Sequence, residues 1–329
     1  MDSLLINKIF SGTDKDFNAL AASVFDFQYA NNIVYRQWCN LVNGKEAANS
    51  KQDSLLDIPF MPISFFKSHT VTTTSFEPQL VFESSGTTQT INSKHLVKDA
   101  GIYEQSFIKA FEFFYGNIKD WCIIGLLPSY LERNNSSLIK MANELITISN
   151  HPQSGFYVYD FESLYEVLTA LESRHQKTLL IGVTFALLDF AEQYQMQLHH
   201  TVVMETGGMK GRREELTRSQ VHAILQKGLG VKHVHSEYGM TELLSQAYSK
   251  GEGRFVCPTW MKVLVRDEED PFNIRTHGKG VLNVIDLANV YSCSFIATED
   301  VGVVYEDGSF EVWGRLDNSD IRGCSLLVV

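Results

Sequence analysis

The stretch S-E-Y-G-M-T-E at residues 236–242 says most about how this sequence folds. It follows the apolar run Val231–Val234, which is typical of a buried β-strand. Tyr238 offers a flat ring on which a base can stack, and Thr241 offers a hydroxyl. Glu242 carries the hard carboxylate oxygens that Mg²⁺ prefers. Taken alone, the stretch is also compatible with the start of a helix that exposes its glutamate.

Upstream of this stretch, short apolar runs alternate with amphipathic segments. The apolar runs are Gln79–Phe82, Trp121–Leu127, Phe156–Tyr159, Thr178–Val183 and Thr201–Met204. Helical periodicity occupies 99–115 and 136–148, and a third helix is expected from Arg212 to Gly228. Strands that alternate with helices favour parallel pairing and right-handed crossovers, so we expect an α/β body.

The two ends of the sequence do not show this alternation of strands and helices. Asp16 to Trp38 has loosely helical spacing of aromatic and aliphatic residues. After residue 250, four strand-like runs are separated by glycine or acidic turns: Val256–Val265, Gly280–Ile285, Gly302–Tyr305 and Phe310–Trp313. We therefore expect a helical segment (1–75), an α/β body (76–250) and a smaller antiparallel β lobe (251–329).

Composition excludes several classes of protein. Among 329 residues, 28 Lys and Arg face 39 Asp and Glu, and the net charge of −11 argues against binding to a nucleic acid polymer. No apolar run reaches the ~18 residues of a membrane span, and the N-terminus lacks the features of a signal peptide. The five cysteines, an odd number without close pairs, indicate reduced thiols in a cytoplasmic protein.

A second motif is the loop F-E-S-S-G-T-T-Q-T-I-N-S-K at residues 82–94. Gly86 has no Cβ, so the backbone can approach a ligand closely there. Hydroxyl and N–H groups that can donate to phosphate come from Ser84, Ser85, Thr87 and Thr88, and Lys94 adds a cation. The loop is not a Walker P-loop, and by itself it is also compatible with a solvated turn.

Three further motifs follow in order: T-G-G at 206–208, T-E-D at 298–300 and G-R-L-D at 314–317. With the two motifs above, the ordered set resembles the adenylate-forming superfamily, which includes acyl-CoA ligases, luciferases and peptide-synthetase adenylation domains. Y-G-x-T-E is its most specific part.

The resemblance implies a role for each matching residue. Ser84 to Thr88 and Lys94 would line the triphosphate of ATP, Thr241 would bind the α-phosphate, and Glu242 would hold Mg²⁺. The adenine would lie between Gly207-Gly208 and the Tyr238-Gly239 side, while Asp300 and Arg315 would hold the ribose or a phosphate. Thr184, Phe185 and His235 would line the acyl pocket, although Thr184 and Phe185 are equally compatible with the packed core.

Two departures narrow the resemblance. After the two threonines this sequence lacks the usual Gly-x-Pro-Lys, and it ends where the superfamily's C-terminal lysine domain would start. A short adenylating chain with R-G-C-S-L-L at residues 322–327, close to its C-terminus, resembles the acyl-protein synthetase (LuxE-type) family of fatty-acid reductase systems. Cys324 would then carry the acyl group as a thioester, although most free cysteines are buried packing residues.

The resemblance therefore implies an acid–thiol ligase with the large N-terminal domain of the superfamily and without its lysine domain. It would use ATP and Mg²⁺ to activate a carboxylic acid, most naturally a fatty acid, and pass the acyl group to a protein thiol. An acyl-reductase or acyltransferase would be its partner. Two alternatives stay open: a short aryl-acid CoA ligase of the phenylacetate type, and a nucleotide-binding relative without turnover.

Overall fold

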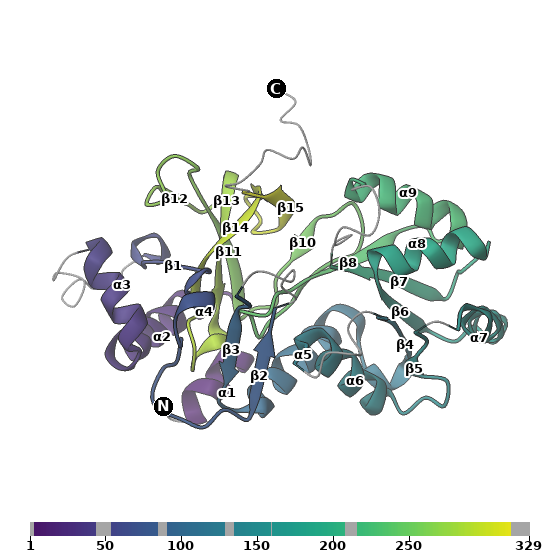
Figure 1. The fold of residues 1–329 in the computed structure, drawn as a ribbon, viewed down its shortest axis with the longest axis horizontal. Helices are drawn as coiled ribbons and strands as arrows, with labels where there is room; N and C mark the ends of the chain where they lie inside the picture. Colours follow the sequence, from purple (N-terminus) through teal and green to yellow (C-terminus); the bar gives the residue numbers. More distant parts are fainter. Residues whose placement is uncertain are drawn as a thin grey trace. The chain divides into compact units, whose positions relative to one another are not determined.

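The computed structural model describes residues 3–43, 54–84, 91–128, 135–158, 160–207 and 216–316. The chain forms two compact units, each assembled from segments that are distant in sequence (Figure 1). Among the described residues, unit 1 holds those up to 109, residues 239–246 and those from 256 onward. Unit 2 holds residues 110–238 and 247–255. The chain therefore leaves unit 2 after residue 238 and contributes one short loop to unit 1 before it returns.

Unit 2 is built on a parallel sheet. Its strands are β4 (Cys122–Leu126), β5 (Gly155–Phe156), β6 (Thr178–Val183), β7 (Thr201–Thr206), β8 (Val234–Tyr238) and β9 (Ala247–Ser249). The spatial order is β9-β8-β7-β6-β4-β5, and only β9 is antiparallel to its neighbour. The helical elements of this part are η3 (Ile118–Asp120), α6 (Ser137–Ser149), α7 (Phe161–Ser173), α8 (Thr184–Gln193) and α9 (Arg218–Leu229).

The strands of unit 2 appear in the sequence as uninterrupted apolar runs because their side chains are buried on both faces of the sheet. All residues of β4 and β6 are buried, as expected for parallel strands covered on both faces. Helices α8 and α9 lie side by side (Figure 1). They approach so closely at Gly228 that a Cβ added there would lie 2.8 Å from the carbonyl oxygen of Ala191.

Unit 1 contains an antiparallel sheet in the order β12-β11-β13-β14-β15. These strands are β11 (Met261–Arg266), β12 (Ile274–Arg275), β13 (Gly278–Asp286), β14 (Phe295–Val304) and β15 (Phe310–Arg315), and η4 (Leu287–Asn289) follows β13. Strand β1 (Met61–Pro62) joins β14 in parallel, with Met61 opposite Ile296. A separate antiparallel pair consists of β2 (Leu80–Glu83) and β3 (Lys94–Val97). The strand β10 (Phe255–Val256) lies where the sequence passes from unit 2 to unit 1.

The N-terminal helices cover part of this sheet with aromatic side chains. The helices of the segment are α1 (Ser3–Ser11), α2 (Phe17–Asn31), α3 (Ile33–Asn43), η2 (Leu55–Asp57) and α4 (Phe65–Ser68). Tyr35 of α3 stacks on Phe295 of β14 with ring centroids 5.9 Å apart, and Phe25 and Phe60 meet the same ring edge-on. Helix α5 (Ala100–Tyr115) continues from this segment into unit 2.

The predicted α/β body and the antiparallel strands after residue 256 are confirmed. Three details differ from the expectation. Strand β8 begins at Val234 rather than Val231, because pairing with β7 starts only at the Val203–Val234 pair. Helix α9 begins at Arg218, where Thr217 and Gln220 form a capping box. Helix α8 was not foreseen, because seven of its ten residues are buried and no polar face marks it.

No helix within the described ranges is both long and apolar enough to cross a lipid bilayer.

Candidate functional site

The T-E pair of the opening motif lies in unit 1, on the loop formed by residues 239–246. Glu242 is only 6% exposed. Burial raises the pKa of its carboxyl, while nearby Ser93 and the positive charges of Arg315 and Lys67 oppose that rise. A buried carboxylate that senses two cations is suited to holding a metal ion or to facing a charged ligand.

Asp300 and Arg315 form an ion pair in the same unit. They face each other across β14 and β15, and Arg315 Nε lies 3.1 Å from Asp300 Oδ1. The Asp300 side chain is 8% exposed and that of Arg315 is 72% exposed. The backbone N–H of Asp300 donates to Thr298 Oγ1, so the T-E-D motif is internally hydrogen-bonded. The structure thus brings together Glu242, Asp300 and Arg315, which come from three separate motifs.

The hydroxyl-rich loop is described only at its base. Ser84 and Ser93 close the β2–β3 pair, with Ser84 N donating to Ser93 O at 3.1 Å and Ser93 N donating to Ser84 Oγ at 2.9 Å. Lys94 Nζ lies 3.3 Å from Glu83 Oε1 and its side chain is largely exposed. The predicted phosphate-binding residues Ser85, Gly86, Thr87 and Thr88 fall outside the described ranges.

In unit 2, several predicted residues gather at the carboxyl ends of β6 and β7. Gly207 has φ of 71°, a left-handed conformation that favours glycine. Thr184 Oγ1 donates to Gly207 O at 2.8 Å and to Glu205 Oε2 at 3.2 Å. Phe185 belongs to the hydrophobic core of this unit. Gly208 lies beyond the part of the chain that the structure describes.

Two carboxyl groups lie near the carboxyl ends of β7 and β8, the buried Glu205 and the half-buried Glu237, and no sequence motif assigns a role to either of them. Glu205 accepts a bond from Arg218 Nε at 3.3 Å and lies 3.7 Å from His222 Nε2. Burial raises the pKa of Glu205, but His222 and Arg218 outweigh this effect and the pKa is lowered. Glu237 accepts a bond from Thr206 Oγ1, and burial raises its pKa to about 7.

Tyr238, the expected adenine platform, ends β8. Its side chain is 8% exposed, and its ring lies 5.8 Å from that of Phe255 at an angle of 58°. The Arg218 guanidinium lies 5.1 Å from the centroid of the Phe255 ring. Phe255 and Arg218 therefore fix the aromatic surroundings of this part of unit 2. Gly239, the next residue, is exposed and begins the loop that enters unit 1.

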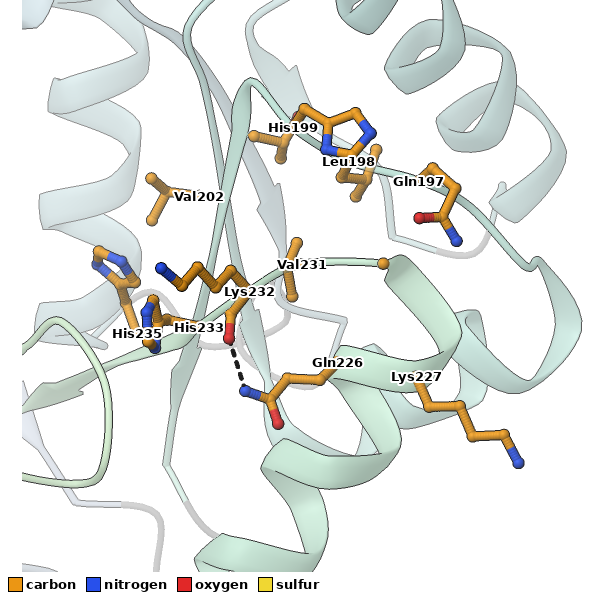
Figure 2. Close-up of a pocket in the computed structure, with 12 residues that line it drawn as sticks. Gln197, Leu198, His199, Val202, Gln226, Lys227, Val231, Lys232, His233 and His235 are labelled. Atoms are coloured by element: carbon orange, nitrogen blue, oxygen red, sulfur yellow. Dashed lines mark hydrogen bonds between the residues drawn. The ribbon is translucent and has the colours of Figure 1, made fainter.

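His235 lies at the start of β8 and lines a pocket of about 600 Å³ (Figure 2). Most side chains around this pocket are polar or basic, including His199, His233 and Lys232 (Figure 2). His235 Nδ1 lies 3.1 Å from Tyr115 Oη, and burial followed by nearby Lys250 lowers its pKa to about 4. No Asp or Glu is among the described residues that line the pocket. This character suits a polar or anionic group better than an alkyl chain.

Sequence reasoning missed His95, which contacts the back of the motif loop. His95 Nδ1 lies 3.0 Å from Thr241 O, and Nε2 lies 2.8 Å from Ser292 Oγ. Burial lowers its pKa to about 4, so the ring is neutral at physiological pH. No motif marks this residue, because its role depends on two contacts that are distant in sequence.

Within the described part of the chain, no three His, Cys, Asp or Glu side chains converge as a metal site. Mg²⁺ is commonly held by one or two carboxylates together with substrate phosphates, so a lone buried Glu242 fits that cation. Bound there, Mg²⁺ would supply positive charge to phosphate oxygens.

Comparisons with known proteins bear on this geometry. A 2-hydroxyisobutyryl-CoA ligase crystallised in the postadenylation state matches with a TM-score of 0.60 and 10% identity, over 94% of this chain and 70% of its own. ATP-bound MatB from Rhodopseudomonas palustris matches with a TM-score of 0.53 and 18% identity, over 73% of this chain. The match takes in about half of the MatB chain (49%). These likenesses give the fold, which is that of the adenylate-forming ligases.

Sequence comparisons identify the branch within that fold. The sequence model for the acyl-protein synthetase family, LuxE, matches residues 10–329. The long-chain-fatty-acid–luciferin-component ligase of Vibrio harveyi is 22% identical over 97% of this chain and 91% of its own length. The protein of the same name from Aliivibrio fischeri is 23% identical over 93% and 86%. The chain belongs to the LuxE acyl-protein synthetase family.

Proposed function

We propose that this protein activates a fatty acid with ATP as an acyl-adenylate and transfers the acyl group to a protein cysteine as a thioester. The family match over residues 10–329 carries this proposal. The buried Glu242 near the Asp300–Arg315 pair supports it, because these three residues come from separate motifs of the sequence and lie together in unit 1. The relatives named for fatty-acid ligation support a long-chain acid as substrate.

We assign the contacts with the phosphates, the ribose and Mg²⁺ mainly to residues of unit 1. We assign the α-phosphate to the Thr241 hydroxyl, the ribose hydroxyls to the Asp300 carboxylate and a ribose or phosphate contact to Arg315. Glu242 would hold Mg²⁺, and Lys94 would contact the outer phosphates. Gly207, Gly208 and Tyr238 remain our assignments for the adenine, and Ser84 to Thr88 remain those for the triphosphate.

The first step is an adenylyl transfer. One carboxylate oxygen of the fatty acid forms a bond to the α-phosphorus of ATP, and the bond from that phosphorus to the bridging oxygen of pyrophosphate breaks. Negative charge grows on the departing oxygens, so fixed cations and hydrogen-bond donors aimed at them lower the barrier. We assign that stabilisation to Lys94 and Arg315, while the Thr241 hydroxyl donates to the α-phosphate.

The second step is an acyl transfer to sulfur. A cysteine thiolate attacks the carbonyl carbon of the acyl-adenylate, the thioester bond forms, and AMP leaves with the electron pair of the broken acyl–phosphate bond. We propose Cys324 as that thiol; it lies outside the described residues. An acyl-reductase or acyltransferase would then consume the thioester.

A thiol acceptor requires a reducing setting, which accords with the expected cytoplasmic location. Cys39, Cys122, Cys257 and Cys293, the cysteines of the described ranges, form no disulfide. Burial raises the pKa of Cys122 to about 11 and that of Cys39 to about 12, so neither supplies a reactive thiolate.

Acid-dependent exchange of labelled pyrophosphate into ATP tests the proposal. We expect exchange with long-chain acids and weaker exchange as the chain shortens from tetradecanoate to acetate. Absence of exchange with every acid would overturn the enzymatic function and favour a nucleotide-binding role. Exchange followed by release of acyl-CoA, without labelled protein, would favour a CoA ligase.

A further inference from the structure

The loop that carries Thr241 and Glu242 is attached to unit 1 by two fully buried side chains, Asp286 and Asn289. Asp286 ends β13, and Asn289 ends the short helix η4 that follows it. Both are 0% exposed. No sequence motif includes them, and neither has a role in the function proposed above.

Asp286 binds the loop through both carboxylate oxygens. Its Oδ2 accepts the backbone N–H groups of Leu244 and Ser245, each at 2.9 Å. Its Oδ1 accepts the Ser245 hydroxyl at 2.6 Å and the backbone N–H of Ala288 at 3.0 Å. All four partners are donors, so the site is built for an ionised carboxylate and would reject an amide NH₂ in its place.

Asn289 adds contacts of the opposite kind. Its Nδ2 donates to the carbonyl oxygen of Glu242 at 2.7 Å and to that of Cys293 at 3.1 Å. Its Oδ1 accepts the backbone N–H of Leu244 at 3.0 Å. The Asn289 amide therefore binds the backbone of Glu242 directly. Among side chains as short as this one, only Asn offers both an amide donor and a carbonyl acceptor.

A further layer of buried side chains secures the η4 region. Gln28 of α2 donates to the carbonyl oxygens of Asn289 and Val290 and accepts the backbone N–H of Ser294. Asn32 donates to the carbonyl oxygen of Ser292 at 2.9 Å. The N-terminal helices thus reach the motif loop through one intermediate turn.

We propose that Asp286 and Asn289 are positioning residues for adenylation, which hold the Thr241–Glu242 backbone in the conformation that the phosphate and metal contacts require. The proposal rests on the function proposed above. Its physical basis is that these hydrogen bonds are desolvated and complementary, so removing one leaves a buried group unpaired and lets the loop move. Partners that orient a ligand from behind typically change activity by about 10–100-fold when they are removed.

The test uses the full chain and separates the two half-reactions. Asp286→Asn and Asn289→Ala are compared with wild type for pyrophosphate exchange, with KM measured for ATP and for fatty acid. Acyl transfer to the protein from supplied acyl-adenylate is measured in parallel, since that step does not use the outer phosphates. Tyr35→Phe is the matched control, because it removes a fully buried bond to Pro59 O in the same unit without touching the loop.

We expect exchange to fall about 10–100-fold in both variants, with more Mg²⁺ needed for half-maximal rate and the fatty-acid KM within about twofold of wild type. Transfer from supplied acyl-adenylate should fall less than exchange, because it still uses the α-phosphate contact assigned to Thr241 but neither the pyrophosphate nor the Mg²⁺ assigned to Glu242. If Asp286→Asn does not fold, the exchange and transfer rates of Asn289→Ala alone test the positioning role.

Two results would overturn the positioning role while leaving the proposed function intact. One is wild-type exchange in a folded Asn289→Ala variant. The other is an equal loss of both half-reactions in the loop variants. If Tyr35→Phe also lost both equally, general destabilisation of unit 1 would be the cause. Wild-type protein without any exchange would overturn the proposed function itself, and the positioning role with it.

Discussion

Arg315 Nε lies 3.1 Å from Asp300 Oδ1, at a point where the register of β14 and β15 sets the two residues directly opposite each other. The carboxylate is buried on one side of this pair and the guanidinium is exposed on the other. Because the guanidinium lies largely in water, the pair contributes little stability, about 0–1 kcal/mol, since solvent screening and side-chain entropy oppose it. Its value here is orientation, since the pair holds the Asp300 carboxylate at a fixed place on β14.

Replacing Asp300 should therefore weaken nucleotide binding more than folding. Asp300→Asn keeps the shape but loses the charge-assisted acceptor for two hydroxyls, and we expect KM for ATP to rise about 10–100-fold. Steady-state exchange kinetics over a range of ATP concentrations measure this effect. Glu299→Gln is the control, since Glu299 is the exposed neighbour on the same strand. Equal effects of the two substitutions would refute the assignment of Asp300.

Glu242→Gln should slow adenylation on the order of 100-fold, because an amide cannot replace a carboxylate beside a divalent cation. The loss should be partly reversed by raising the Mg²⁺ concentration. The folded state should be retained or slightly stabilised near neutral pH, since burial already disfavours the charged form of this group. Exchange rates titrated with Mg²⁺ and thermal unfolding together check both statements. An unchanged Mg²⁺ dependence in the variant would count against metal binding at this residue.

Lys94 can be replaced with little effect on folding, because its side chain is largely exposed. Its pair with Glu83 is partly exposed, so Lys94→Ala should change the free energy of unfolding by less than ~1 kcal/mol. If Lys94 contacts the outer phosphates, KM for ATP should rise several-fold while the fatty-acid KM stays constant. Glu83→Gln breaks the same pair without removing the cation and should leave KM for ATP unchanged. Matching effects of the two variants would mean that only the ion pair matters.

Much of the fold could be predicted from the sequence because its buried strands appear as uninterrupted apolar runs. Runs such as Thr178–Val183 are uninterrupted because both faces of a parallel sheet are covered, and their short length, together with the residues that flank them, favours a strand over a helix. Helix α8 carries no such signal, since it is almost as buried as the strands. Periodicity therefore fails where both faces of a helix are inside.

The candidate site was predictable only where it coincides with a motif. Thr241, Glu242, Asp300 and Arg315 are found by their place in ordered signatures. Asp286, Asn289 and His95 act through backbone groups more than 40 positions away, and short sequence patterns do not encode such contacts. Glu237 stands inside the motif, yet only the structure reveals that Thr206 faces it and that it is half-buried.

Glu237 should make folding depend on pH. Burial raises its pKa from 4.5 to about 7, so the folded protein binds a proton more tightly than the unfolded chain does. Its contribution to stability is complete below about pH 4.5 and is lost as the pH rises through about 7. Glu237→Gln, which resembles the protonated form, should be more stable than wild type at pH 8, by ~1 kcal/mol or more, and should lose that advantage at pH 5.

Urea unfolding of wild type and Glu237→Gln at several pH values isolates this group, because titrations common to both proteins cancel in the difference. Asp286 has a pKa raised to about 6 and contributes in the same direction to both. His95 and His235, whose pKa values are lowered, contribute in the opposite direction to both. A stability difference that does not vary from pH 5 to pH 8 would contradict the raised pKa of Glu237.

The central claim is that the acyl group ends on a thiol of this chain. Incubation with labelled long-chain fatty acid, ATP and Mg²⁺, followed by denaturation and treatment with neutral hydroxylamine, tests it most directly. We expect about one hydroxylamine-labile acyl group per wild-type chain and none on Cys324→Ser, with pyrophosphate exchange retained in that variant. Undiminished labelling of Cys324→Ser, or acyl-CoA as the only product when CoA is present, would contradict it.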